Sequence, residues 1–72
     1  MYSKNDIQNM VGSLMFHIEE KDICLISKIN MNENYCTFDL FQIRTNILYK
    51  GHFLGRTEKD VSKTLRDIWI FV

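Results

Sequence analysis

Residues 22–54 read DICLISKINMNENYCTFDLFQIRTNILYKGHFL, and this stretch decides the fold. Three runs rich in β-branched and aromatic residues, over 22–30, 35–43 and 46–54, are separated by short segments of turn-forming residues. The pattern predicts three antiparallel strands joined by hairpins. With the turns near Asn32 and between Arg44 and Thr45, one parity forms the core face: Cys24, Ile26, Cys36, Phe38, Leu40, Ile47, Tyr49 and Phe53.

A helix is expected on each side of this stretch. Over residues 3–21 an i, i+3, i+4 spacing of apolar residues predicts the first helix, and Ser3 with Asp6 forms a capping pair at its start. Thr57 with Asp60 forms a second capping pair, which predicts a helix from Glu58 to the C-terminus. The sequence therefore predicts a single α+β domain over residues 1–72, in the order α-β-β-β-α, with a three-stranded antiparallel sheet packed with two helices.

Composition narrows the class of protein. The chain has 46% apolar residues and no net charge, which predicts a folded globular protein and gives no sign of a general polyanion binder. No apolar run approaches the roughly 18 residues of a membrane span, and no secretion signal is visible, so a cytoplasmic protein is expected. The absence of Ala and Pro beside many Ile, Asn and Lys residues hints at an AT-rich source such as a phage or mobile element.

The residues that could carry chemistry are sparse. Neither His17 nor His52 has a second metal ligand at a suitable spacing, and strand parity places Cys24 and His52 on opposite faces. Cys24 and Cys36 fall roughly 13 Å apart in this register, too far for a disulfide. We therefore expect free thiols, no catalytic site, no cofactor and no metal.

Surplus apolar surface is the main functional clue. The second face of the predicted sheet carries Leu25, Phe41, Ile43 and Leu48, and the chain ends in the apolar run 68–72, more than two helices cover easily. One alternative is that helices pack on both faces and cover it. The other is a small non-enzymatic protein-binding or regulatory module, an inhibitor or a homodimer, that docks through an apolar patch. The contact residues expected for it are Phe41, Ile43, Leu48, Leu54, Trp69 and Phe71.

A second hypothesis is a nucleic-acid-binding module. Lys59, Lys63 and Arg66 follow an i, i+4, i+7 spacing on the predicted second helix, and Arg56 precedes them. The order α-β-β-β-α resembles that of the double-stranded RNA-binding domain, and the resemblance implies phosphate contacts by Lys59 and Lys63. Steep weakening of binding by salt would distinguish this hypothesis from apolar docking.

Overall fold

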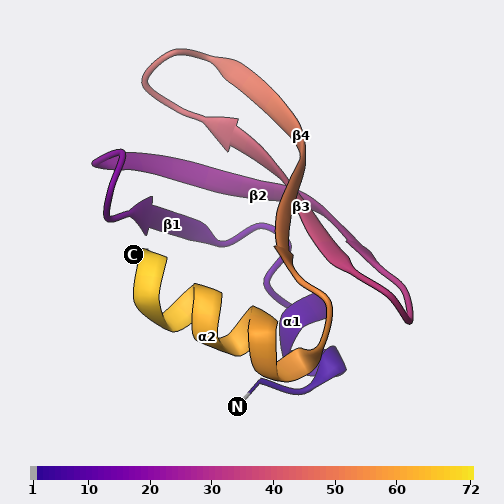
Figure 1. Ribbon diagram of the computed structural model, residues 1–72. Coiled ribbons are helices and arrows are strands. Elements are labelled where there is room, and N and C mark those ends of the chain that lie inside the picture. The colour runs from indigo at the N-terminus through magenta and orange to yellow at the C-terminus, as the bar shows by residue number, and fades with distance from the viewer. Residues whose placement is uncertain (1) are drawn as a thin grey trace.

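The computed structural model describes residues 2–72 and contains one five-stranded antiparallel sheet. The elements are α1 (Lys4–Gln8), β1 (Leu14–His17), β2 (Asp22–Met31), β3 (Cys36–Gln42), β4 (Ile47–Gly55), α2 (Glu58–Ile68) and β5 (Trp69–Phe71). The strand order is β4-β3-β2-β1-β5, so β4 and β5 are the two edges (Figure 1). The class is α+β-like as predicted, but the three-stranded sheet and the order α-β-β-β-α are wrong. The resemblance of element order to the double-stranded RNA-binding domain is lost with them.

The first predicted helix breaks into a helix of one turn and a strand. Its start is as expected, because Ser3 and Asp6 form a reciprocal capping box. The helix ends at Gln8, and Gly12 adopts a φ of +90°, a left-handed conformation that costs a glycine little and that a helix cannot contain. The Gly12 N–H then donates to the carbonyl of Ile26, and residues 14–17 pair with β2. This pairing gives hydrogen-bond partners to the backbone groups at the edge of β2, which a longer helix would leave unpaired.

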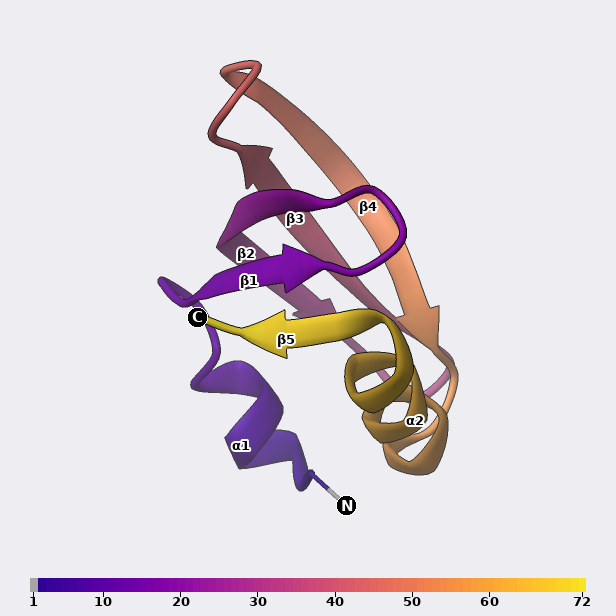
Figure 2. The ribbon, with the colours of Figure 1, turned by 90° about the vertical axis from the view of Figure 1, so that its left-hand side faces the viewer.

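The C-terminus also becomes a strand. The helix predicted to run to the end of the chain stops at Ile68, and Trp69–Phe71 turn back to pair with β1 (Figure 2). Hydrogen bonds from Ile18 to the Ile68 carbonyl and from Val72 to the Leu14 carbonyl extend this pairing at both ends. The run of aromatic and β-branched residues over 69–72 suits the exposed edge of β1 better than it suits a helix.

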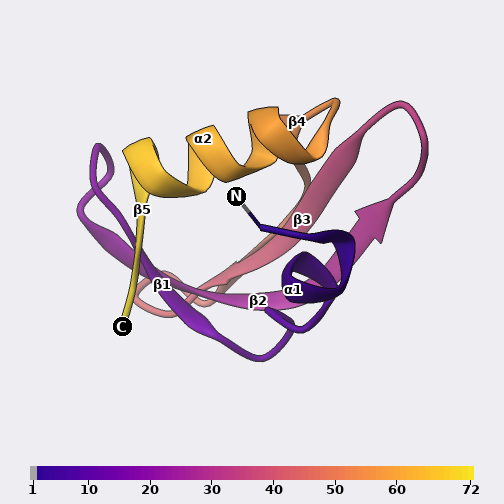
Figure 3. The same cartoon turned by 90° about the horizontal axis from the view of Figure 1, so that it is seen from below.

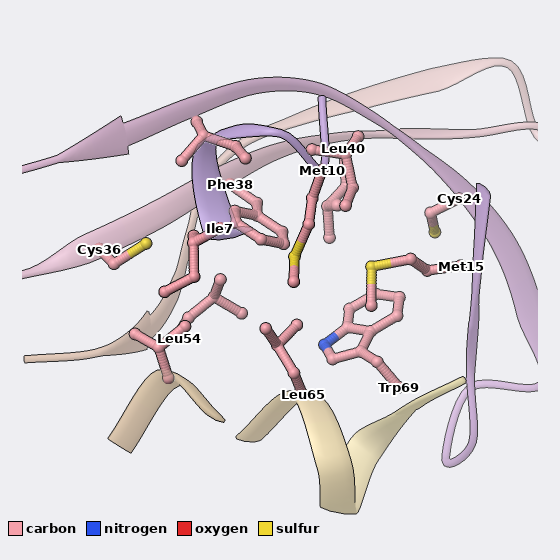
Figure 4. Packing of buried hydrophobic residues seen from close by; sticks show 13 residues of the cluster. Ile7, Met10, Met15, Cys24, Cys36, Phe38, Leu40, Leu54, Leu65 and Trp69 are labelled. Atoms are coloured by element: carbon pink, nitrogen blue, oxygen red, sulfur yellow. The ribbon is translucent and has the colours of Figure 1, made fainter. Parts of the chain in front are cut away.

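Both helices lie on one side of the curved sheet (Figures 1 and 3). Side chains from α1, α2 and the concave side of the strands form a single core, shown in Figure 4. Phe38, Ile7, Met15, Ile26 and Val61 are its most completely buried large side chains. The opposite, outer side of the sheet has no helix over it in the described chain.

The predicted core face is right for β2, β3 and the first half of β4 and wrong for the second half of β4. Cys24, Ile26, Cys36, Phe38 and Leu40 are buried. Ile47 and Tyr49 lie on the concave side as predicted, although both are exposed, whereas Phe53 lies on the outer side. One extra residue enters β4 between the pairs Leu40–Tyr49 and Phe38–His52, and this β-bulge reverses the parity of the strand. Phe53 therefore lies opposite Thr37 on the outer side, and Leu54 is buried instead.

The two thiols are free, as predicted. Cys24 lies opposite Gln42 near one end of β3, and Cys36 begins that strand. Six residues of extended chain between these positions place the thiols roughly 20 Å apart. Both are buried and unbridged. Within residues 2–72, no helix has the length and apolar character needed to cross a membrane.

Candidate functional site

The outer side of the sheet carries two rows of apolar residues that lie opposite one another across the strands. We call these eight residues the apolar face. The first row crosses β1, β2, β3 and β4 and consists of Leu14, Leu25, Phe41 and Leu48. The second row crosses β5, β1 and β2 and continues just past β3, and it consists of Ile70, Phe16, Ile23 and Ile43.

Most of the apolar face is open to solvent. Five of its large hydrophobic side chains are exposed, and Ile70, the most exposed, keeps 54% of its surface. The other four are Leu14, Ile23, Ile43 and Leu48. Phe16, Leu25 and Phe41 lie between them and are partly buried by their neighbours. Single exposed apolar residues are common on proteins, but a contiguous group of this kind marks an interaction surface.

The other half of the outer side is mainly polar, although the exposed Phe53 of β4 also lies there, opposite Thr37. Lys28 lies opposite Asp39, and the Ser27 hydroxyl donates to the Asp39 carbonyl at 3.1 Å. The Asp39 carboxylate also accepts from the Gly51 N–H at 2.9 Å. The apolar face is therefore confined to the half of the sheet nearer the turn that joins β3 and β4.

The six residues predicted to contact a partner are not all on one surface. Phe41, Ile43 and Leu48 lie together in the apolar face. Leu54 and Trp69 are core residues, 2% and 3% exposed, so they are not available at the surface. Phe71 lies opposite Met15 on the concave side, with its ring 6.5 Å from that of Tyr2.

Sequence reasoning did not assign five members of the apolar face to the contact surface. Leu14, Phe16, Ile23, Leu25 and Ile70 belong to β1, β2 and β5. Two of these strands were predicted as helix, and that assignment concealed their outward residues. The sequence Leu14–His17 shows no apolar–polar alternation, and its alternating burial, with Met15 buried between more exposed neighbours, appears only in the structure.

The predicted nucleic-acid contacts are on the surface. Arg56, Lys59, Lys63 and Arg66 are all exposed, and the last three border one shallow depression on α2 together with Asp60. The Arg66 guanidinium is 3.1 Å from the Asp67 carboxylate. The charges of this helix surface are thus mixed, with acids interleaved among the bases.

A pocket of about 240 Å³ opens on the concave side, where the two edges of the curved sheet approach each other. His17 and Trp69 come from β1 and β5, and Tyr49 and His52 come from β4 at the opposite edge. The remaining lining residues are Glu20, Asp22, Cys24, Leu40 and Gln42.

The polar side chains at the base of this pocket satisfy one another. Asp22 accepts from Nε2 of Gln42 at 2.6 Å and from Nε and Nη2 of Arg44, both at 2.8 Å. The Arg44 guanidinium lowers the pKa of the Asp22 carboxyl, more than burial raises it. The Gln42 side-chain oxygen in turn accepts from Thr45 and, at 3.4 Å, from the Tyr49 hydroxyl.

Two imidazoles and the indole form an aromatic cluster in the pocket wall. The His17 ring is 4.5 Å from Trp69 and 6.4 Å from His52, and His52 is 5.9 Å from Trp69. Desolvation lowers the pKa of His52, and neighbouring His17 lowers it further. Nδ1 of His17 accepts from the Glu20 N–H at 3.0 Å, so the proton of the neutral ring is on Nε2.

Cys24 and His52 both line this pocket, so the prediction that they lie on opposite faces is wrong. The β-bulge in β4 is again the reason. Burial is the main cause that raises the pKa of the Cys24 thiol, and Asp22 and Glu20 add to it, so the thiol is protonated near neutral pH. Within residues 2–72 no group of three or more His, Cys, Asp and Glu residues could hold a metal ion.

No protein-family model matches the chain, and neither a curated protein nor a solved structure shows a match.

Proposed function

We propose that this chain is a non-enzymatic protein-binding module that docks through the apolar face. The observation that carries the proposal is the pair of apolar rows spanning the outer side of the sheet, on the side away from both helices. Exposed apolar surface of this extent is costly in water, because burial contributes about 25 cal/mol per Å². A partner that covered the face would recover that free energy.

The area matches that of a specific interface. A large side chain presents about 150 to 250 Å² when fully exposed, so the eight partly exposed members of the apolar face leave on the order of 600 Å² of apolar surface. This area approaches the roughly 800 Å² per partner of a standard interface. Phe16 and Phe41 lie in adjacent rows near the middle, where aromatic anchors contribute most to binding.

The occupant that the face fits is a second copy of the chain. The apolar face contains no charged side chain, so two copies meet without repulsion, and a two-fold axis through it pairs each apolar row with its counterpart. Two sheets packed face to face in this way form a sandwich about 10 Å thick. A domain of 72 residues gains from such an arrangement, because its own core supplies little stability.

The nucleic-acid hypothesis remains an alternative prediction. Its residues Arg56, Lys59, Lys63 and Arg66 lie on α2, on a different surface from the apolar face. We favour protein docking because acids interrupt the basic residues and Arg66 is already paired with Asp67. A salt series separates the two, since phosphate binding weakens steeply with salt and apolar docking does not.

Two neighbouring residues provide a matched test. Leu48 and Ile47 are adjacent in β4 and are each 46% exposed, but Leu48 belongs to the apolar face and Ile47 lies opposite Gln42 on the concave side. Sedimentation equilibrium of the wild type, Leu48→Asp and Ile47→Asp at 10 µM to 1 mM measures association. We expect dimers of the wild type and of Ile47→Asp, and a monomer of Leu48→Asp with unchanged circular dichroism.

A wild-type monomer throughout this range would overturn the second copy as occupant. Equal dissociation by both variants would show that the apolar face is not the contact surface. Salt-sensitive binding of a DNA or RNA duplex by the wild type, with no self-association, would replace the proposal by the nucleic-acid alternative.

A further inference from the structure

The concave pocket lies where binding sites form in rolled sheets, between two edges that do not pair with each other. Side chains from β4 and from β1 and β5 face one another across it, although these strands are at opposite ends of the sheet order. The mouth of a closed or partly closed barrel is a common place for a small-molecule site. The apolar face is on the other side of the sheet, so the two surfaces are independent.

Four of the nine residues that line the pocket carry aromatic rings. The rings of His17, His52 and Trp69 are nearly perpendicular in every pair, with interplanar angles of 86° to 88°. Tyr49 adds a fourth ring, and its hydroxyl is directed to Gln42. The electron-rich faces of aromatic rings attract a compact cation.

The charge of the lining has the matching sign. Glu20 and Asp22 are acidic, and among residues 2–72 no Lys or Arg lines the pocket. Arg44 offsets the charge of Asp22 from outside the lining, which leaves the carboxylate of Glu20.

We propose that this pocket binds a small methylated ammonium group. A primary ammonium needs several oxygen acceptors to replace its water, and only the Glu20 carboxylate is left for it, because both oxygens of Asp22 and the side-chain oxygen of Gln42 already accept hydrogen bonds. A quaternary ammonium donates no hydrogen bonds and binds through its charge and its methyl groups. The 240 Å³ volume is large enough for a trimethylammonium group.

Choline and its uncharged isostere 3,3-dimethyl-1-butanol are the first probes, each titrated into the full chain and followed by ¹H–¹⁵N NMR. We expect choline to shift the resonances of Tyr49 and His52 and to bind roughly 5- to 30-fold more tightly than the isostere, the ratio that a cation–π contribution predicts. Tyr49→Ala should weaken choline binding by a similar factor. Tyr35→Ala, which changes an exposed tyrosine outside the pocket, should leave it unchanged.

The same titration with Nε-trimethyllysine and with lysine identifies the source of the ammonium group. Tighter binding of trimethyllysine than of choline points to a modified side chain, and the reverse points to a free or headgroup choline. Equal binding of choline and its isostere would overturn the proposal, because the pocket would then recognise shape alone. Loss of affinity in Tyr35→Ala, or shifts confined to the apolar face, would overturn it as well. None of these outcomes depends on whether the chain dimerises.

Discussion

Trp69 provides a sharp test of the core, because its indole N–H is buried without a partner. The side chain is 3% exposed, and within the described residues Nε1 has no hydrogen-bond acceptor. Figure 4 shows the nitrogen directed into the core near Leu65 rather than toward Cys24. An unsatisfied buried donor costs about 1 to 3 kcal/mol. Truncation to alanine should remove far more stability than replacement by phenylalanine.

The magnitudes follow from what each variant removes. Trp69→Ala deletes a large buried aromatic side chain and should lower the free energy of unfolding by about 3 to 5 kcal/mol. Trp69→Phe leaves a void where part of the indole was, which lowers the free energy of unfolding by about 1 kcal/mol for each methyl-sized volume. It also removes the buried N–H that has no acceptor, which raises the free energy of unfolding. The two effects nearly cancel, so we expect Trp69→Phe to lie within about 1 kcal/mol of the wild type.

Urea unfolding followed by far-ultraviolet circular dichroism measures both variants, since each lacks the single tryptophan of the chain. Phe71→Ala in the same strand is the control, and its 41% exposure predicts a smaller loss than Trp69→Ala. Equal destabilisation by Trp69→Phe and Trp69→Ala would refute the reasoning. It would mean that the indole N–H is satisfied in solution.

Three further predictions concern the turn into α2 and the two titrating groups. A Cβ on Gly55 would lie 2.7 Å from a side-chain carbon of α2, so Gly55→Ala should lower the free energy of unfolding by about 1 to 3 kcal/mol in urea melts. A Cβ on Gly12 would meet no atom within 4 Å, so Gly12→Ala should lower the free energy of unfolding by less, through the positive φ alone. Equal losses in the two variants would contradict the close approach of Gly55 to α2. Asp22 is paired with Arg44, and its pKa is lowered in the folded chain. The ionised carboxylate therefore stabilises the fold fully above the unfolded pKa of 3.8, and this stabilisation is lost as the pH falls through the folded pKa. Acid melts should therefore show a smaller loss between pH 5 and 2 in Asp22→Asn, and an unchanged loss would argue against the pair. The lowered pKa of His52 means that the unfolded chain binds its proton more readily, so stability should fall as the pH drops through the unfolded value of 6.5 toward the lower folded pKa. His52→Gln should flatten that slope in thermal melts.

The middle of the chain was predictable because its strands carry strong local signals. Alternation placed Cys24, Ile26, Phe38 and Leu40 in the core, and the capping pair at Ser3 marked the start of α1 correctly. Both helix starts follow from side-chain hydrogen bonds made within four residues. Signals of that range are readable from sequence.

The two ends of the chain were not predictable in the same way. Residues 14–17 become a strand because they pair with β2 on one side and with residues 69–71 on the other. Pairing between segments this far apart in the sequence leaves no local pattern. The bulge in β4 is likewise set by pairing, and it reversed the faces of Phe53 and Leu54. The apolar face depends on all of these pairings, which is why only Phe41, Ile43 and Leu48 of it were predicted as contacts.

Burial of the apolar face against a second copy is the central claim, and an isotope-filtered NOE spectrum tests it most directly. An equal mixture of ¹³C-labelled and unlabelled chains reports only contacts between copies. We expect intermolecular NOEs from the rings of Phe16 and Phe41 to methyl groups of Leu14, Leu25 and Leu48, all members of the two apolar rows. Intermolecular NOEs from α2 or the concave side instead, or none at millimolar concentration, would contradict it.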